Sequence, residues 1–234
     1  KIDAKILELC TTINDYKSVD LCEYPCIQFG LEAALLDLKN GGERVYFNNS
    51  FSSGEKTIKI NGLIWMNDKD SMLQSIETKI QEGFNCIKLK IGAINFKDEI
   101  DLLKHIRKEF NAEKLEIRVD ANGAFSTNQA LSKIEKLSKF DIHSIEQPIQ
   151  PGQHKELNKI CSHSAIDVAL DEELIYTPKN ESNDLLSYVR PKYIILKPSL
   201  IGGIESTKKW ISTAGKLNIS WWMTSALESN LGLN

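Results

Sequence analysis

The chain has 234 residues, of which 41% are hydrophobic and 26% charged, and its formal net charge is −3. This composition is ordinary for a globular protein with one large domain, and it excludes the basic field that holds nucleic acid or an anionic membrane surface. No apolar run approaches the roughly 18 residues of a membrane-spanning helix, and the first residues lack the layout of a signal peptide.

The first 50 residues carry the periodicity of helices. Apolar residues recur at helical spacing over 2–13 and again over 29–38, and Asn40-Gly41-Gly42 comes next as a helix stop. These helices are too few to form a good domain alone, so we expect residues 1–50 to pack on the later part of the chain or on a missing N-terminal part. The chain begins without Met inside a helical pattern and ends just after an expected strand, which is typical of a fragment.

The five cysteines are odd in number and scattered, which indicates reduced thiols and a cytoplasmic protein. Cys22 and Cys26 have the spacing of half a zinc site, but no second pair of Cys or His occurs at a suitable distance. We therefore favour idle or buried thiols over a zinc site.

From residue 51 onward, short apolar runs alternate with helical patterns. The expected strands are 58–65, 86–90, 115–120, 142–146, 167–171, 193–197 and 219–224, and Gly202-Gly203 opens the last helix between them. This alternation predicts an α/β fold with a parallel sheet that curls into a TIM-type (β/α) barrel over residues 51–234. A closed barrel normally has eight strands, so we expect an eighth beyond Asn234.

Five of these strands end in an ionisable residue at regular intervals. The residues are Lys90, Asp120, Glu146, Asp171 and Lys197, separated by 30, 26, 25 and 26 positions. Because the catalytic groups of a barrel gather at the carboxyl ends of its strands, we expect these side chains to share one rim.

Side chains alternate between the two faces of a strand, so the residue two positions before a rim residue also points inward. This rule places Lys88 and Arg118 on the inner face, with Asn122 just beyond the third strand. By the same rule His143 on the fourth strand should face the helices.

Asp120, Glu146 and Asp171 form the acidic part of this rim. Within about 4 Å of one another, each pair would repel by about 4 kcal/mol at an effective dielectric constant of 20, so the cluster needs protons or a cation. Carboxylate oxygens are hard donors that suit Mg²⁺, or alternatively Mn²⁺, better than zinc. A single acidic residue at a strand end is more often a helix cap or a solvated charge, but three at near-equal intervals favour a metal site.

The lysines beside the acids are candidate bases. A like-charged neighbour and burial both lower the pKa of a lysine, so Lys90 next to Lys88 can be neutral near pH 7 and accept a proton. Lys197 approaches from across the barrel. A divalent ion facing such a base suits removal of a proton α to a carboxylate. The alternative is that these lysines only balance the carboxylate charges.

Five short motifs together resemble the enolase superfamily, muconate-lactonising subgroup. They are Lys88-Leu-Lys90, Val119-Asp-Ala-Asn122, Glu146-Gln-Pro148, Asp171-Glu172 and Leu196-Lys-Pro198. The resemblance covers about residue 20 to the end and implies a modified (βα)7β barrel, with residues 1–50 as the helical C-terminal part of the capping domain. Residues 61–65, 118–120 and 225–229 make it most similar to the o-succinylbenzoate synthase family of menaquinone biosynthesis.

The resemblance implies a Mg²⁺-dependent carbon–oxygen lyase. Lys90 would remove the α-proton of 2-succinyl-6-hydroxy-2,4-cyclohexadiene-1-carboxylate and then protonate the departing hydroxyl on the same face, giving 2-succinylbenzoate. Lys197 would stabilise the enediolate by its charge. The implied metal ligands are Asp120, Glu146 and Asp171, and the implied substrate contacts are Lys88, Arg118, Asn122, Thr224 and Ser225.

Other functions stay open from the sequence. N-succinylamino acid racemases and dipeptide epimerases of the same subgroup share these lysines and ligands. In another class of enzyme, Lys197 would form a Schiff base, as in barrel aldolases. The chain is also compatible with a fragment or a binding barrel that has no catalytic activity.

Overall fold

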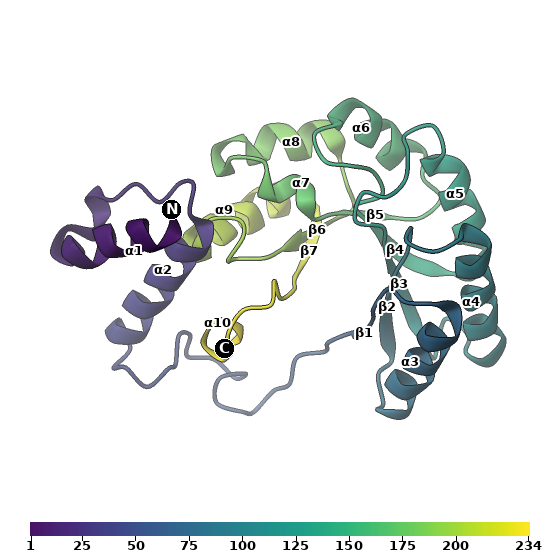
Figure 1. Ribbon diagram of the computed structural model, residues 1–234, viewed down its shortest axis with the longest axis horizontal. Helices are drawn as coiled ribbons and strands as arrows, with labels where there is room; N and C mark the ends of the chain where they lie inside the picture. The colour runs from purple at the N-terminus through teal and green to yellow at the C-terminus, as the bar shows by residue number, and fades with distance from the viewer.

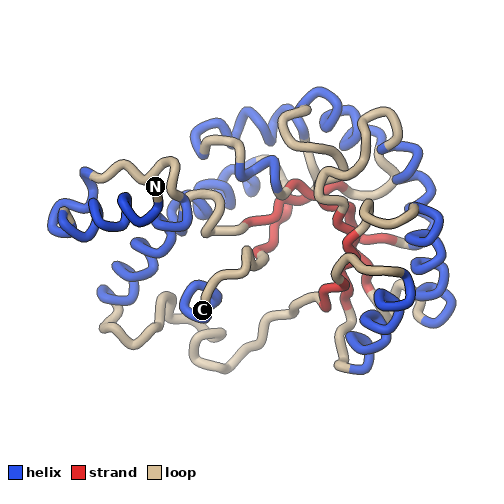
Figure 2. The backbone as a smooth tube through the Cα atoms, in the orientation of Figure 1, coloured by secondary structure: helices blue, strands red, loops and turns tan.

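The computed structural model describes residues 1–234, except for the side chain of Lys179. Its centre is a parallel sheet of seven strands in the order β1 to β7, so each strand pairs with its neighbour in sequence. The strands form an arc with the helices along its outer side (Figures 1 and 2). β1 and β7 are the two edges, and no eighth strand closes the sheet among the described residues. The predicted α/β, TIM-type architecture is confirmed as an open, partial barrel.

The strands are shorter than the sequence predicts at several ends. They span Gly62–Ile64 (β1), Cys86–Lys90 (β2), Glu116–Asp120 (β3), Ile142–Glu146 (β4), Val168–Leu170 (β5), Tyr193–Leu196 (β6) and Ser220–Met223 (β7). Asp171 and Lys197 lie just past the ladder because their backbones already turn toward the next helix. β1 is an edge strand paired only with β2, and the apolar residues Ile58 and Ile60 before it are exposed.

Helices come after the strands as the βα pattern predicts. They span Lys69–Gln81 (α3), Phe96–Glu109 (α4), Ala130–Leu137 (α5), His154–His163 (α6), Glu172–Ile175 (α7), Ser182–Val189 (α8), Gly203–Lys216 (α9) and Asn230–Leu233 (α10), with short 3₁₀ turns at Ser138–Phe140 (η2) and Lys179–Glu181 (η3). Asp68 begins α3 by accepting a hydrogen bond from the Ser71 amide at 3.0 Å. Among the described residues, no helix has the length and apolar character to cross a membrane.

The main core lies between the outer face of the sheet and the helices. Ile87 and Leu89 alternate along β2 with Lys88 and Lys90, and the two apolar side chains are almost completely buried against the helical layer. The alternation therefore directs apolar side chains outward to the helices and leaves the lysines facing the hollow of the barrel.

The N-terminal helices Ile2–Thr11 (α1), Ile13–Ser18 (η1, a 3₁₀ helix) and Pro25–Lys39 (α2) precede the barrel. They share a small core of Leu9, Val19 and Leu21. α2 lies beside α9, so this segment touches the barrel at the helix that comes after β6 (Figure 1). The division into a capping-domain remnant over 1–50 and a barrel over 51–234 stays a prediction.

Candidate active site

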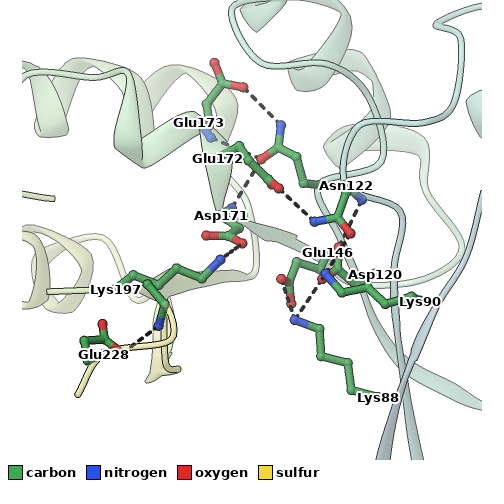
Figure 3. Close-up of polar contacts among 12 residues, drawn as sticks. Lys88, Lys90, Asp120, Asn122, Glu146, Asp171, Glu172, Glu173, Lys197 and Glu228 are labelled. Atoms are coloured by element: carbon green, nitrogen blue, oxygen red, sulfur yellow. Dashed lines mark hydrogen bonds and ion pairs between the residues drawn. The ribbon is translucent and has the colours of Figure 1, made fainter. Parts of the chain in front are cut away.

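Neighbouring strands bring three rim residues into one row. In the ladder Lys90 on β2 pairs with Asp120 on β3, and Asp120 pairs with Glu146 on β4. Asp171 comes directly after β5 and Lys197 directly after β6, and both side chains turn toward the same region (Figure 3). The regular spacing of these residues along the chain therefore corresponds to one rim, as the sequence predicts.

Ion pairs connect the rim residues. The Nζ of Lys88 lies 2.6 Å from Glu146 Oε1 and 2.9 Å from Asp120 Oδ2, so it bridges two carboxylates. The Nζ of Lys90 lies 2.6 Å from the same Asp120 oxygen, and Lys197 pairs with Asp171 (Figure 3). Buried charges persist only when they are paired, and each of these carboxylates has an amine partner.

The pKa values of Glu146 and Asp120 shift in opposite directions. Burial raises the pKa of Glu146 well above its usual value, Lys88 opposes this shift, and the negative charges of Asp120 and Asp171 add to it. Burial also favours the neutral form of Asp120, but Lys88, a hydrogen bond with Glu146 and Lys90 outweigh it and lower the pKa of Asp120 to about 2.

Lys88 responds in the opposite sense. Burial works to lower its pKa, yet the pKa is raised because Glu146 and Asp120 hold the ammonium form. A neighbouring lysine such as Lys90 would by itself lower the pKa of Lys88. At Lys88 the adjacent carboxylates win instead, because they are in direct contact with its ammonium group.

The donor set fits a hard divalent cation. Asp120, Glu146 and Asp171 are 0%, 3% and 1% exposed, and such a group of buried carboxylates requires positive charge. In the arrangement described, amines supply that charge, and no three acidic, His or Cys side chains of the described residues are grouped closely enough to hold a metal. The Lys88 ammonium occupies the position between Asp120 and Glu146. An ion that replaced it would find carboxylate oxygens, which Mg²⁺ prefers.

Asn122 is positioned by the turn after β3. Its φ is 43°, and its amide nitrogen donates to Asp120 Oδ1 at 3.0 Å. Its side-chain Oδ1 accepts a hydrogen bond from Lys90 Nζ at 2.7 Å, and its Nδ2 donates to Glu172 Oε1 at 2.8 Å. An ammonium group can only donate and a carboxylate only accept, so the two partners together fix the orientation of the amide.

Glu172 is a site residue to which the sequence led us to assign no role. Its carboxylate orients the amide that contacts Lys90, and its other oxygen, Oε2, is buried without a hydrogen-bond partner among the described residues. The available signal was its position directly after Asp171, within a motif already noted for the family resemblance.

Gln147 and Glu173 were missed as well. Gln147 is completely buried, and its Oε1 accepts hydrogen bonds from the backbone amides of Asp171 at 3.2 Å and Glu173 at 3.3 Å. Its Nε2 donates to Glu173 Oε2 at 3.3 Å, and His154 pairs with the other oxygen of Glu173 at 2.8 Å. Gln147 thereby connects the end of β4 to the backbone of Asp171, the residue that comes directly after β5.

Arg118 lies on the inner face, as predicted. Its Nε donates to Glu116 Oε1 at 2.7 Å, and its guanidinium lies 4.4 Å from the ring centroid of Trp222 on β7. The side chain therefore contacts a residue of β7 across the hollow of the barrel.

The expectation that His143 faces the helices is wrong. Its ring stacks on Tyr193 at 5.0 Å and meets Trp222 edge-on, so it lies on the inner face. The register explains the difference. Ile117 pairs with Ile142, while the next residue, Arg118, pairs with Ser144, which leaves His143 as the extra residue of a bulge. A bulge re-aims a side chain that simple alternation places on the other face.

Thr224 and Ser225 come after β7 and line the hollow of the barrel. The hollow has a volume of about 1080 Å³, and its lining also includes Lys88, Lys90 and Lys197. Ser225 donates to Glu228 Oε2 at 2.8 Å, and Glu228 Oε1 accepts from Ser199. Glu228, which the sequence did not single out, thus joins the loops after β6 and β7.

Comparisons with known proteins identify the family of this chain. A family model described as "Enolase C-terminal domain-like" matches residues 71–234. The chain is 50% identical over 210 residues to "o-succinylbenzoate synthase" of Desulfotalea psychrophila, a match that covers 90% of this chain and 57% of that protein.

Solved structures give the same result. The crystal structure of MenC from Desulfotalea psychrophila LSv54 superimposes with a TM-score of 0.87 at 45% identity, over 97% of this chain and 63% of that one. A dipeptide epimerase from Enterococcus faecalis V583 gives a TM-score of 0.77 at 20% identity, over 90% of this chain and 60% of that one, which shows the fold alone.

The chain thus spans about 57% of the curated relative it resembles. The resemblance that the five motifs predict is confirmed, since the family model covers most of the barrel and every rim residue. The chain belongs to the enolase superfamily, within the family of enolase C-terminal domain-like proteins.

Proposed function

We propose that this chain provides the barrel of an o-succinylbenzoate synthase, a Mg²⁺-dependent carbon–oxygen lyase. The relative that is 50% identical carries that name, and members of the superfamily typically use a divalent metal ion. The substrate proposed is a small carboxylate, 2-succinyl-6-hydroxy-2,4-cyclohexadiene-1-carboxylate. One observation carries the proposal: three buried carboxylates lie along one rim, and Lys90 and Lys197 pair with two of them from different strands.

Asp120, Glu146 and Asp171 would hold the metal ion. When bound, the ion would supply positive charge for the substrate carboxylate and for the negative charge that develops next to it. The remaining chemistry belongs to side chains of this chain.

Lys90 acts as the base. For this role its Nζ must first lose a proton and separate from Asp120, with which it is paired in the structure. Its lone pair then takes the α-proton of the substrate, and the electron pair of the broken C–H bond moves into the enediolate. The same ammonium returns the proton to the hydroxyl group on the same face, the C–O bond breaks, water leaves, and the ring becomes aromatic.

Lys197 and Lys88 hold charge rather than move protons. Lys197 stabilises the enediolate with its ammonium group, and Lys88 binds the substrate carboxylate. Asn122 accepts a hydrogen bond from Lys90 through its Oδ1. This bond fixes the orientation of the Lys90 amine, so that its lone pair can point toward the substrate. Arg118, Thr224 and Ser225 contact the rest of the substrate from the wall of the hollow.

A second function is favoured by one feature of the same site. Racemisation or epimerisation of an acylamino acid needs a base on each face of the α-carbon, and Lys90 and Lys197 come from β2 and the end of β6. Both reactions begin by removing an α-proton, so the products decide between them. A Schiff base on Lys197 has less support, because that lysine is paired with Asp171.

The test measures turnover of the substrate by the purified chain with Mg²⁺. The absorbance of the aromatic product monitors the reaction. The wild type should form 2-succinylbenzoate, Lys90→Ala should form none, and the exposed-residue control Lys104→Ala should match the wild type. Retained turnover in Lys90→Ala would remove Lys90 as the base. Deuterium uptake from D₂O at the α-carbon of N-succinylamino acids, without aromatic product, would assign a racemase instead. A borohydride-trapped adduct would assign a Schiff-base enzyme.

A further inference from the structure

The first turn of α9 is capped by a side chain from a distant part of the chain. Glu32 on α2 accepts hydrogen bonds through its Oε2 from the backbone amides of Ile204, at 2.5 Å, and Glu205, at 3.1 Å. Its other oxygen, Oε1, accepts from Gln28 Nε2 at 2.6 Å, which holds the carboxylate in place. The first amides of a helix have no partner within the helix, and a carboxylate there also interacts favourably with the helix dipole.

α9 cannot supply this cap from its own sequence. The residue at the N-cap position is Gly202, with φ of 95° and no side chain, whereas a capping side chain needs an extended backbone. Gly203 has φ of 87°, and a Cβ added there would lie 2.5 Å from Glu32 Oε2. The Gly202-Gly203 turn is therefore shaped to admit a carboxylate from another helix.

The capped turn is connected by short hydrogen bonds to the residue that comes after β6. The carbonyl oxygen of Lys197 accepts from the amides of Leu200 at 2.8 Å and Ile201 at 3.1 Å. The carbonyl oxygen of Pro198 accepts from the amide of Gly203 at 2.8 Å. The loop between Lys197 and α9 thus has little freedom as long as the first turn of α9 is formed.

We propose that Glu32 is a positioning residue for Lys197. Through the α9 cap, the N-terminal helical segment holds the loop from which the Lys197 ammonium reaches Asp171, although α2 itself contributes no group to the rim. The effect of Glu32 on catalysis rests on the proposed function, whereas the helix cap and the placement of Lys197 do not depend on it. Glu32 lies outside the residues matched by the family model, so the link joins the helical segment to the chemistry of the barrel.

The test compares Glu32→Ala and Glu32→Gln with the control Glu23→Ala, an exposed glutamate just before α2. Amide hydrogen exchange at Ile204 and Glu205 should become about five- to tenfold faster in Glu32→Ala, the size of effect expected for the loss of one helix cap. Glu32→Gln keeps an oxygen acceptor without its charge and should recover part of the protection. Glu23→Ala should not differ from the wild type. Unchanged exchange in Glu32→Ala would overturn the cap.

A second measurement reads the placement of Lys197 without turnover. With lysine labelled at Cε with ¹³C, and the Lys197 signal assigned by Lys197→Arg, that signal should shift in Glu32→Ala and return toward the wild-type position in Glu32→Gln. Faster exchange with an unmoved Lys197 signal would overturn the positioning role.

Kinetics separate this proposal from the proposed function. In an active enzyme, kcat should fall about tenfold in Glu32→Ala, while KM stays within about twofold, because Lys197 acts on the enediolate rather than on the bound substrate. Equal loss in kcat for Glu23→Ala would contradict a specific role. A wild type without lyase activity would refute the proposed function alone, since exchange and the Lys197 signal would still report on the cap.

Discussion

Replacing Lys88 with methionine is expected to destabilise the protein strongly in the absence of divalent metal. The Lys88 ammonium lies 2.6 Å from Glu146 Oε1 and 2.9 Å from Asp120 Oδ2, and these carboxylates are almost completely buried. Methionine has a similar shape but no charge, so both carboxylates lose a cation that water cannot replace. Breaking a buried ion pair in this way costs about 3–5 kcal/mol.

The assay is thermal unfolding in EDTA. For a chain of this length, about 3–5 kcal/mol corresponds to a decrease in Tm of about 6–20 °C. The matched control is Lys104→Met, because Lys104 is exposed and pairs with Asp101 at 3.2 Å on the surface of α4. Such a surface pair contributes at most about 1 kcal/mol.

The same unfolding experiment is repeated with Mg²⁺ in place of EDTA. If the carboxylates form a metal site, Mg²⁺ restores the missing positive charge, and binding at about 100 times Kd stabilises the folded state by about 2.7 kcal/mol. Saturating Mg²⁺ should therefore raise the Tm of Lys88→Met more than that of the wild type, in which Lys88 competes for the same oxygens. Equal losses for Lys88→Met and Lys104→Met in EDTA would refute the reasoning, and so would a Tm of Lys88→Met that Mg²⁺ leaves unchanged.

The other predictions concern the base, its orientation and a partly buried thiol. Lys90→Ala should lose all measurable lyase turnover while keeping the far-ultraviolet circular dichroism of the wild type, because it removes the base without opening the core. Glu172→Ala should lower kcat about tenfold, which is the loss expected for one hydrogen bond that involves a charged group. Glu172→Gln should lower kcat less, because an oxygen still faces Asn122. Equal effects of the two changes would argue against the orienting role of Glu172. Burial raises the pKa of the Cys161 thiol to about 12, so its thiolate is scarce at neutral pH. As long as the pH is below that pKa, the thiolate fraction increases about tenfold for each unit by which the pH rises. Mass spectrometry after iodoacetamide treatment at pH 8 should find exposed Cys10 alkylated well before the partly buried Cys161, and comparable rates would contradict a raised pKa of the Cys161 thiol.

The arrangement of the rim could be predicted because it depends on properties that a sequence displays. Lys90, Asp120 and Glu146 each end a short apolar run, and parallel strands place such ends side by side. The alignment of these strand ends could be predicted without knowing the conformation of the loops between the strands. The roles assigned to these side chains remain predictions until the variants are measured.

Other features depend on local departures from regular geometry. His143 was assigned to the wrong face because a bulge opposite Ile117 and Arg118 shifts the register of β4, and nothing in its sequence marks that extra residue. The raised pKa of Lys88 could not be predicted either, because the sequence shows the neighbouring lysine but not the carboxylates in contact with its ammonium group.

Long-range contacts were the least predictable part. Glu32 and the first turn of α9 are separated by 172 positions, and only the folded chain brings them together. The Gly202-Gly203 pair was recognised as the start of a helix, but not as a turn that leaves room for a carboxylate. Glu172 and Gln147 stood within recognised motifs, yet their roles in orienting Asn122 and the Asp171 backbone depend on hydrogen bonds that only the folded chain shows.

A crystal structure of the protein grown with Mn²⁺, with the ion located by its anomalous scattering, tests the site most directly. We predict a single ion bound by oxygens of Asp120, Glu146 and Asp171 at about 2.0–2.2 Å, with the Nζ of Lys88 withdrawn from between the first two carboxylates. An ion bound elsewhere, or the three carboxylates still paired with their lysines at saturating Mn²⁺, would contradict the proposed metal site.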